Sequence, residues 1–150
     1  MVNIRRATAE DACRLAEIEV FDYRLNFYPF FHTDAYFFGE MNVPALMDEY
    51  LREPERIGRT LVYDDGVVKG FIRVNGTEVE KLFVEPAFQN MGIGGRLLER
   101  AVALTGADNL LALEKNEGAI RFYERHGFTV TDERRRVDDT AEFFVVMRRR

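Results

Sequence analysis

The hydrophobic residues of this chain recur with a period of two in several short segments and with a helical period in others, which predicts both strands and helices. The turn sequences Asp65-Gly66 and Asn75-Gly76 accept positive φ and favour tight hairpins between alternating segments. Pro86 cannot continue a hydrogen-bonded ladder. The pattern therefore predicts an antiparallel meander over residues 59–63, 67–74 and 77–84.

Apolar residues at helical spacing predict further helices, and the remaining short apolar segments predict strands. The connection between residues 77–84 and 110–113 is long enough for a crossover helix, which favours parallel pairing of these two strands. The aromatic-rich segment 21–53 has no clear period. We expect helices at about 9–20, 44–52, 92–105 and 117–126, and further strands at about 2–6, 110–113, 128–131 and 142–147.

Residues 82–98 have the pattern of a strand, a glycine-rich loop and an amphipathic helix. The first N–H groups of a helix lack partners within the helix, and the helix dipole adds partial positive charge there. Gly92, Gly94 and Gly95 remove side chains that would keep an anion away from these groups. A P-loop would continue with Gly-Lys-Ser/Thr, and a dinucleotide fingerprint would have a glycine at the position of Leu97. The junction therefore predicts a different site for a phosphate or pyrophosphate.

The spacing Gln89-x-x-Gly92-x-Gly94 after a strand that ends in Val-x-Pro resembles the acetyl-CoA loop of the GCN5-related N-acetyltransferase (GNAT) family. A second block, residues 116–128, resembles the other signature of that family, in the family's order. The resemblance implies an α/β fold of the acyl-CoA N-acyltransferase type. Such a fold has a central twisted mixed sheet of about seven strands, about four flanking helices, and a splay between strands 4 and 5.

The resemblance also implies how the acyl donor is held. The strand before the loop would pair with the pantetheine arm by backbone hydrogen bonds, as if the arm were another strand. A backbone N–H near Phe83 would polarise the acetyl carbonyl. The matching cofactor-binding positions are Leu82, Phe83, Val84, Gln89, Asn90, Met91, Gly92, Ile93, Gly94, Gly95, Arg96, Asn116, Ala119, Phe122 and Tyr123.

Two positions match the family's catalytic residues. Tyr123 stands where the family often has a general acid, and a phenol with a pKa near 10 can protonate a departing thiolate. Tyr123 shares one helix face with Ala119 and Asn116. Asn116 is also a suitable N-cap for this helix. Glu80 resembles a position used for a base or for holding water, and Glu78 is the alternative. Each residue also has a purely structural interpretation, which stays open. Tyr123 would be a tyrosine at the edge of the core, and Glu80 would be a surface glutamate paired with lysine.

Composition narrows the class of protein. The 21 basic and 26 acidic residues give a net charge of −5, which argues against a nucleic-acid partner. No stretch approaches the ~18 apolar residues of a membrane span, and the first residues lack the apolar run of a signal peptide. Two histidines and one cysteine give no metal-ligand spacing and no intrachain disulfide. We expect a single N-acetyltransferase domain over residues 1–150, in the cytoplasm, without a metal or a membrane partner, and a homodimer stays open.

The sequence thus predicts an enzyme that transfers the acetyl group of acetyl-CoA directly to a primary amine through a ternary complex. The acceptor is either a small molecule or a protein amine, at an N-terminus or a lysine. In the family, the early helices and the late hairpin build the acceptor site. In this chain the early helices correspond to residues 21–53 and the late hairpin to residues 131–141. The alternative is a non-catalytic acyl-CoA sensor or interaction module with the same fold, and the phenol of Tyr123 favours the enzyme.

Overall fold

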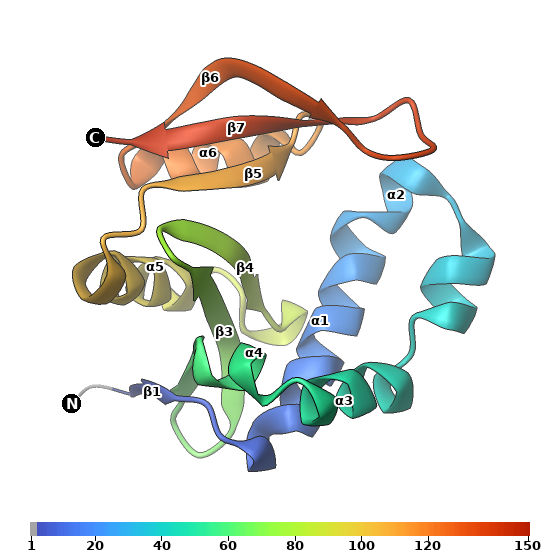
Figure 1. The fold of residues 1–150 in the computed structure, drawn as a ribbon, viewed down its shortest axis with the longest axis vertical. Helices are drawn as coiled ribbons and strands as arrows, with labels where there is room; N and C mark the ends of the chain where they lie inside the picture. The colour runs from blue at the N-terminus through green and yellow to red at the C-terminus, as the bar shows by residue number, and fades with distance from the viewer. Residues whose placement is uncertain (1–2) are drawn as a thin grey trace.

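A computed structural model describes residues 3–150, which form a mixed seven-stranded sheet with helices on both faces (Figure 1). The strands lie across the sheet in the order β1-β2-β3-β4-β5-β7-β6. The β4–β5 pair is parallel and the other neighbouring pairs are antiparallel. The strands are β1 (Ile4–Arg6), β2 (Thr60–Asp64), β3 (Val68–Asn75), β4 (Glu78–Val84), β5 (Asn109–Leu113), β6 (Phe128–Arg136) and β7 (Phe143–Arg149).

The helices occupy the segments before the meander and between the later strands. They are α1 (Ala12–Asn26), α2 (Tyr28–Phe31), α3 (Val43–Arg52), α4 (Pro54–Gly58), α5 (Ile93–Thr105) and α6 (Glu117–Arg125). Short 3-10 turns η1 (Ala9–Asp11) and η3 (Pro86–Phe88) and a π-helical turn η2 (Tyr36–Glu40) complete them. None of the described helices is long and apolar enough to cross a membrane.

The predicted meander, the parallel crossover, the closing hairpin and the glycine-loop helix are confirmed. The largest difference lies in the first third of the chain, where α1 continues to Asn26 and the short α2, η2 and α4 follow. Glu19 and Asp22 interrupt the apolar period there, yet both side chains are buried. The strands of the closing hairpin are also longer than predicted, and Val2, part of the first predicted strand, lies outside the described residues.

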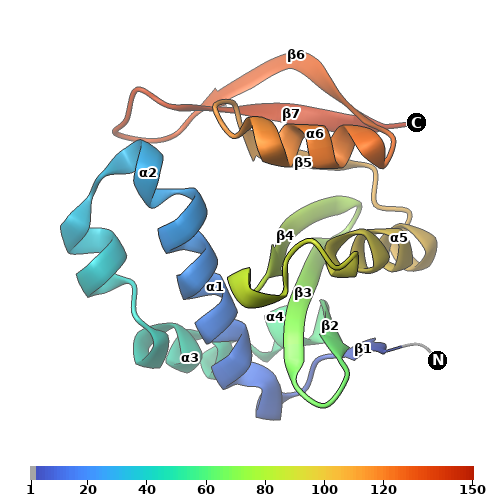
Figure 2. The ribbon, with the colours of Figure 1, turned by 180° about the vertical axis from the view of Figure 1, so that it is seen from behind.

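The two faces of the sheet carry separate hydrophobic cores. On one face, Leu15 and Ile18 of α1 pack with Tyr50 of α3 and with Phe71 of β3. On the other face, Leu97 and other residues of α5 pack against β2, β3 and β4, while α6 packs beside β6. Figures 1 and 2 show α1 and α3 apart from α5 and α6. Strand β4 therefore contributes alternate side chains to two different environments.

Strand β4 leaves its parallel neighbour after a short paired stretch. Only Glu78 and Val79 pair with β5, opposite Asn109 and Leu110, although both strands continue. Immediately afterwards the register of β4 against β3 shifts, so that Glu80 is an extra residue between the pairs Val74–Val79 and Arg73–Lys81. Such a bulge bends a strand and increases its twist. The predicted splay between strands 4 and 5 is thus confirmed, and it begins at the bulge.

Candidate active site

A cavity of about 1570 Å³ occupies the splay between β4 and β5. Its walls come from α1, β4, the glycine loop, β5 and α6, and from the loop between β6 and β7. Figure 2 shows the glycine loop and α5 beside β4, with α6 in front of β5 and β7. All the predicted cofactor-binding residues line this cavity except Met91, which is 62% exposed and outside the lining.

The glycine loop presents backbone donors to the cavity. Asn90 (φ 64°) and Gly92 (φ 81°) both have left-handed conformations, and α5 begins directly after Gly92. Within residues 3–150, no protein group accepts a hydrogen bond from the N–H groups of residues 90–95. The first turn of α5 contains no acidic residue that would repel an anion. The N–H of Arg96 is not among these donors, because it donates to the carbonyl of Gly92 at 3.1 Å.

The glycines that follow in α5 have a second role, which the sequence did not reveal. A Cβ at Gly95 would lie 3.0 Å from Cε1 of His126, and a Cβ at Gly94 would lie 3.4 Å from Cζ of Phe122. These two positions therefore let α5 approach α6 closely. Gly92 is different, because a Cβ there would meet open space. Glycine suits this position because the backbone has a left-handed φ.

The side chain of Gln89 holds the start of the glycine loop. Its Nε2 donates to the carbonyl of Val84 at 3.0 Å and to Oδ1 of Asp22 at 3.3 Å. The other oxygen of Asp22 is buried and has no partner among the described residues. Burial and the nearby Glu85 carboxylate raise the pKa of Asp22 to about 8. No sequence pattern singled out this carboxyl group, which lies on α1 at the cavity wall.

The antiparallel ladder decides which backbone groups of β4 face the splay. The N–H of Glu85 donates to the carbonyl of Lys69, which stands opposite in β3. Hydrogen-bonded and non-hydrogen-bonded pairs alternate in such a ladder, so Phe83 directs its N–H towards β3. The N–H groups that face the cavity are those of Leu82 and Val84. A donor for the acetyl carbonyl is therefore expected on these neighbours and not on Phe83 itself.

Tyr123 and Asn116 lie where the sequence pattern placed them. Asn116 caps α6, because its Oδ1 accepts a hydrogen bond from the N–H of Ala119 at 3.1 Å. Tyr123 lies on the cavity side of the same helix, and its ring packs edge-on against Phe122 and Phe128. Burial raises the pKa of the phenol above its usual value, so Tyr123 stays protonated at neutral pH. No described residue forms a hydrogen bond with its hydroxyl.

Glu80 has a different environment from the one expected of a base. Its carboxylate accepts hydrogen bonds from Nε of Arg73 at 2.8 Å and from Nη1 of Arg59 at 3.1 Å. Burial opposes its ionisation, but these two guanidinium groups outweigh burial and lower the pKa of Glu80 below its usual value. A carboxylate held by two arginines is a weak proton acceptor. The environment of Glu80 therefore suits the structural interpretation, a glutamate in ion pairs, better than the role of a base. The partners are two arginines and not the lysine that was expected.

A polar cluster lies on the α1 face of β4, beside the bulge. Tyr50 donates to Oε1 of Glu19 at 2.6 Å and accepts from Nη1 of Arg73 at 2.9 Å. The Lys81 ammonium group contacts the hydroxyl of Tyr23 and lies 3.9 Å from Oε2 of Glu19. Burial lowers the pKa of Lys81, and the attraction of Glu19 opposes this shift. The sequence placed Lys81 on a strand, but it did not show that the residue lines the cavity.

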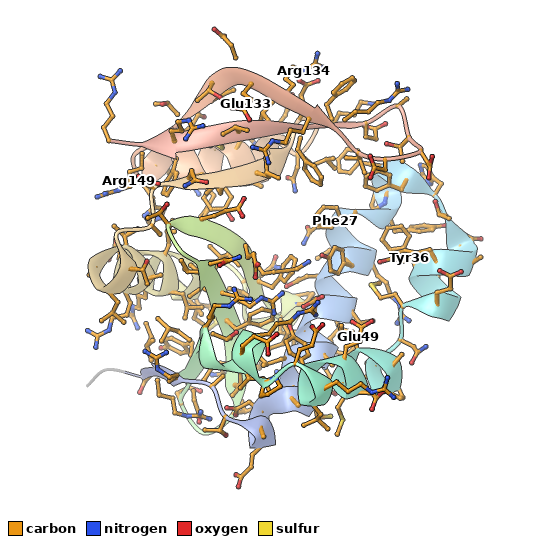
Figure 3. All side chains as sticks on the ribbon, in the orientation of Figure 1. Phe27, Tyr36, Glu49, Glu133, Arg134 and Arg149 are labelled. Carbon is orange, nitrogen blue, oxygen red and sulfur yellow. The ribbon has the colours of Figure 1, made fainter. Side chains whose placement is uncertain are left out.

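Aromatic rings form the wall of the cavity beyond this cluster. Tyr23 lies 4.9 Å from Phe27 and 5.4 Å from Phe83, between ring centroids. Figure 3 shows Phe27 near the junction of α1 and α2, and Tyr36 on the neighbouring η2 segment. The opposite rim comes from the β6–β7 loop, including Asp138 and Asp139. The aromatic wall and this rim fall in the segments that the family resemblance assigned to the acceptor, and the wall comprises Tyr23, Phe27, Phe31, Tyr36 and Phe37.

Comparison with known proteins adds independent findings. Residues 56–130 match the family described as the acetyltransferase (GNAT) domain. The peptidyl-lysine N-acetyltransferase YjaB of Salmonella typhimurium is 31% identical over 142 residues, which cover 95% of this chain and 92% of that protein.

Solved structures share the fold at lower identity. The PaiA N-acetyltransferase of Thermoplasma acidophilum, in complex with coenzyme A, has a TM-score of 0.71 at 20% identity and covers 99% of both chains. The putative acetyltransferase yncA of Salmonella typhimurium, with acetyl-CoA, has a TM-score of 0.66 at 22% identity, over 96% of this chain and 90% of that chain.

Proposed function

The chain belongs to the GNAT family and is an acetyl-CoA-dependent N-acetyltransferase, and from that premise we propose that its acceptor is the side-chain amine of a lysine in a protein or peptide. The similar protein of Salmonella typhimurium is named for peptidyl-lysine acetylation, and the match extends over 95% of this chain. The proposal therefore assigns both the donor subsite and the acceptor subsite to the cavity between β4 and β5.

One observation carries the donor half of the proposal. Among the described residues, the N–H groups of Asn90 and of residues 92–95 have no protein acceptor, and these residues line the cavity where β4 leaves β5. Unpaired donors at a helix N-terminus suit the diphosphate of coenzyme A. The outward-facing backbone of Leu82 and Val84 suits the amides of the pantetheine arm, in the manner of an added strand. Acetyl-CoA supplies the acetyl group as an activated thioester. The donors and the exposed strand edge thus hold the two chemically distinct parts of one ligand.

Tyr123 is the general acid in this proposal. Its phenol lines the cavity, and burial keeps it protonated. A protonated phenol within reach of the departing sulfur gives it a proton, so that the sulfur leaves as a thiol. A backbone N–H of Leu82 or Val84 stabilises the negative charge that develops on the acetyl oxygen. These roles use groups that the structure brings to one cavity from β4 and α6.

The acceptor side of the cavity suits a lysine side chain. Lysine combines a long apolar stem with a cationic end. The aromatic wall offers apolar surface and ring faces, with which a cation interacts favourably. Asp138 and Asp139 lie at the rim, and the whole chain has a net charge of −5, which favours the approach of a positively charged acceptor.

The test uses two matched peptides with acetyl-CoA. One peptide has a free lysine and a blocked N-terminus, and the other has a free N-terminus and arginine in place of the lysine. We expect acetylation of the first peptide alone, located by mass spectrometry and accompanied by thiol release. Acetylation of the second peptide alone would move the acceptor to the N-terminus. Tight binding of acetyl-CoA in calorimetry without turnover on any amine would support the sensor instead.

A further inference from the structure

We propose that Lys81, and not Glu80, accepts the proton that the acceptor's ammonium group must lose before its nitrogen attacks the thioester. The inference deepens the proposed function and rests on it, since it assigns a base to the same reaction. It starts from a contrast among the three lysines of the chain. Lys69 lies 2.9 Å from Asp65 and Lys115 lies 3.2 Å from Glu142, whereas Lys81 has its nearest carboxylate oxygen at 3.9 Å.

The charges around Lys81 balance without it. Glu19 and Glu80 supply the negative charges, and Arg73 and Arg59 supply the positive ones. Oε1 of Glu19 accepts from Tyr50 at 2.6 Å, and the nearest oxygen to Lys81 is Oε2 of the same carboxylate, at 3.9 Å. A charged Lys81 therefore has one distant carboxylate as its counter-charge, and its side chain is only 24% exposed. Burial disfavours such a charge, and the pKa of Lys81 is lowered accordingly.

The groups around Lys81 come from three neighbouring elements. Glu19 and Tyr23 of α1 lie beside its ammonium group, and Arg73 of β3 stands opposite Lys81 and donates in turn to Tyr50 of α3. The rings of Tyr23 and Phe83 lie 4.6 and 5.9 Å from its Nζ. Ring faces stabilise an ammonium group modestly. The lowered pKa makes the proton of Lys81 easier to release, and the ring faces still accommodate the ammonium form when it takes a proton up.

The position of Lys81 separates it from the proposed acid. Lys81 and Phe83 face α1, together with Tyr23, whereas Leu82 and Val84 share the opposite core with Tyr123. Both Lys81 and Tyr123 line the same cavity. The proposed base thus lies on the side of the aromatic wall, where the acceptor enters. The proposed acid lies on the other side of β4, where the sulfur departs.

The protons balance with these two groups. Lys81 takes one proton from the acceptor ammonium, and the neutral nitrogen forms a bond to the acetyl carbon. The carbon–sulfur bond breaks as Tyr123 gives its proton to the sulfur. The amide nitrogen returns its excess proton to the Tyr123 phenolate. One proton then remains on Lys81, which releases it to solvent, so the overall products are acetyl-lysine, coenzyme A and one proton.

Two substitutions separate this role from a structural one. Lys81→Gln removes the amine, and Lys81→Arg keeps a cation that cannot lose its proton at working pH. We expect both to lower kcat/KM for the lysine peptide by about 100-fold or more, which is the usual contribution of a general base. Affinity for acetyl-CoA in calorimetry should stay unchanged. Lys115→Gln is the matched control, because Lys115 is exposed and lies outside the cavity lining.

Wild-type activity in Lys81→Arg would show that only a cation is needed and would overturn the proposal. Wild-type activity in Lys81→Gln would overturn it as well. Neither result would affect the proposed function, because that is tested by turnover of the wild-type protein. If the wild-type protein fails to acetylate the lysine peptide, the proposed acceptor fails and the kinetic test of Lys81 falls with it.

A direct titration needs no catalysis. The chain has three lysines, so selective labelling of their Cε atoms gives three signals to follow by NMR across pH. We expect the Lys81 signal to titrate at the lowest pH of the three. Lys69→Arg and Lys115→Arg assign the signals by elimination if Lys81→Gln does not fold. A Lys81 signal that titrates together with the other two, or above them, would overturn the proposal.

Discussion

The two faces of β4 beyond the bulge differ in chemistry, although one strand supplies both. Towards α5 and α6 the strand presents Leu82 and Val84, and Tyr123 is the polar group of that side. Towards α1 it presents Lys81 beside Glu19. Burial disfavours charge on both sides, but the consequences are opposite: a phenol stays protonated and a lysine tends to lose its proton. The same physical effect thus acts on the proposed acid on one face and on the proposed base on the other.

The strongest test of this comparison removes the acid and leaves the ring. Tyr123→Phe deletes one hydroxyl that has no partner among the described residues, so the fold should tolerate the change. We expect kcat to fall by about 100-fold, because the sulfur must then leave as a thiolate. Calorimetric affinity for acetyl-CoA should change little.

Tyr28→Phe is the matched control for Tyr123→Phe. The hydroxyl of Tyr28 is exposed and donates a hydrogen bond to Asp34, and Tyr28 lies outside the cavity lining. Equal turnover of Tyr123→Phe and the wild-type protein would remove Tyr123 from the mechanism. The two faces of β4 would then differ in composition but not in catalytic role.

The second prediction tests whether burial also sets the protonation of Asp22, a carboxyl group that α1 directs to the cavity wall. Its pKa is about 8 in the folded protein and has the ordinary value of 3.8 when unfolded. Between these values unfolding releases a proton, so the stability of the wild-type protein should fall as pH rises from about 4 to about 8. Asp22→Asn has no carboxyl group to ionise at this position, so it does not lose stability in this way. The difference in unfolding free energy between Asp22→Asn and the wild-type protein should therefore shift in favour of the variant by up to about 4 kcal/mol between pH 5 and pH 8.

Urea unfolding of both proteins at the two pH values measures this effect. Asp64→Asn serves as the contrasting carboxyl, because the N–H of Gly66 and the Arg5 guanidinium lower the pKa of Asp64 instead. Parallel pH curves for the wild-type protein and Asp22→Asn would mean that Asp22 is ionised in the fold. Burial would then not govern the α1 side as the comparison requires.

The smallest expected effect concerns the end of β4, where the strand runs into the glycine loop. Gly92 has a left-handed φ of 81°, which Asn and Asp tolerate better than other residues do, and a side chain there meets open space. Gly92→Asp and Gly92→Asn therefore differ mainly in charge. We expect the aspartate variant to bind acetyl-CoA about tenfold more weakly than the asparagine variant, which corresponds to about 1.4 kcal/mol.

Calorimetry at low and high salt measures that difference, and screening should reduce it as ionic strength rises. Equal affinity of the aspartate and asparagine variants at low salt would contradict a diphosphate site at the N-terminus of α5. It would leave the acid and base of the two faces untouched, because neither depends on the loop.

Much of the fold followed from local patterns. The Asp65-Gly66 and Asn75-Gly76 turns specified the meander, and the helical stripe after Gly92 specified the crossover. The first third of the chain did not follow, because Glu19 and Asp22 look like solvent-facing residues and are buried instead. Their burial depends on Tyr50 and on Gln89, which are distant in sequence.

The candidate site divides in the same way. The donors of the loop, Asn116 and Tyr123 lie within short motifs, so their positions could be predicted. The role of Glu80 could not, since its arginine partners come from β3 and from the residue before β2. The position of Lys81 at the cavity could not be predicted either. A bulge changes the side of the sheet to which the following residues of a strand point, and a bulge depends on the pairing between strands.

The sequence by itself determined the order of the elements from the meander onward, the glycine-rich junction before α5 and the placement of a phenol on the cavity side of α6. These features depend on backbone conformation and on periodicity, which neighbouring residues control. Only the tertiary structure decided which ionisable side chains are desolvated and which are paired. The free energy of a charge depends on everything within several ångströms of it, and in this protein the groups around Lys81 and Asp22 come from separate parts of the chain.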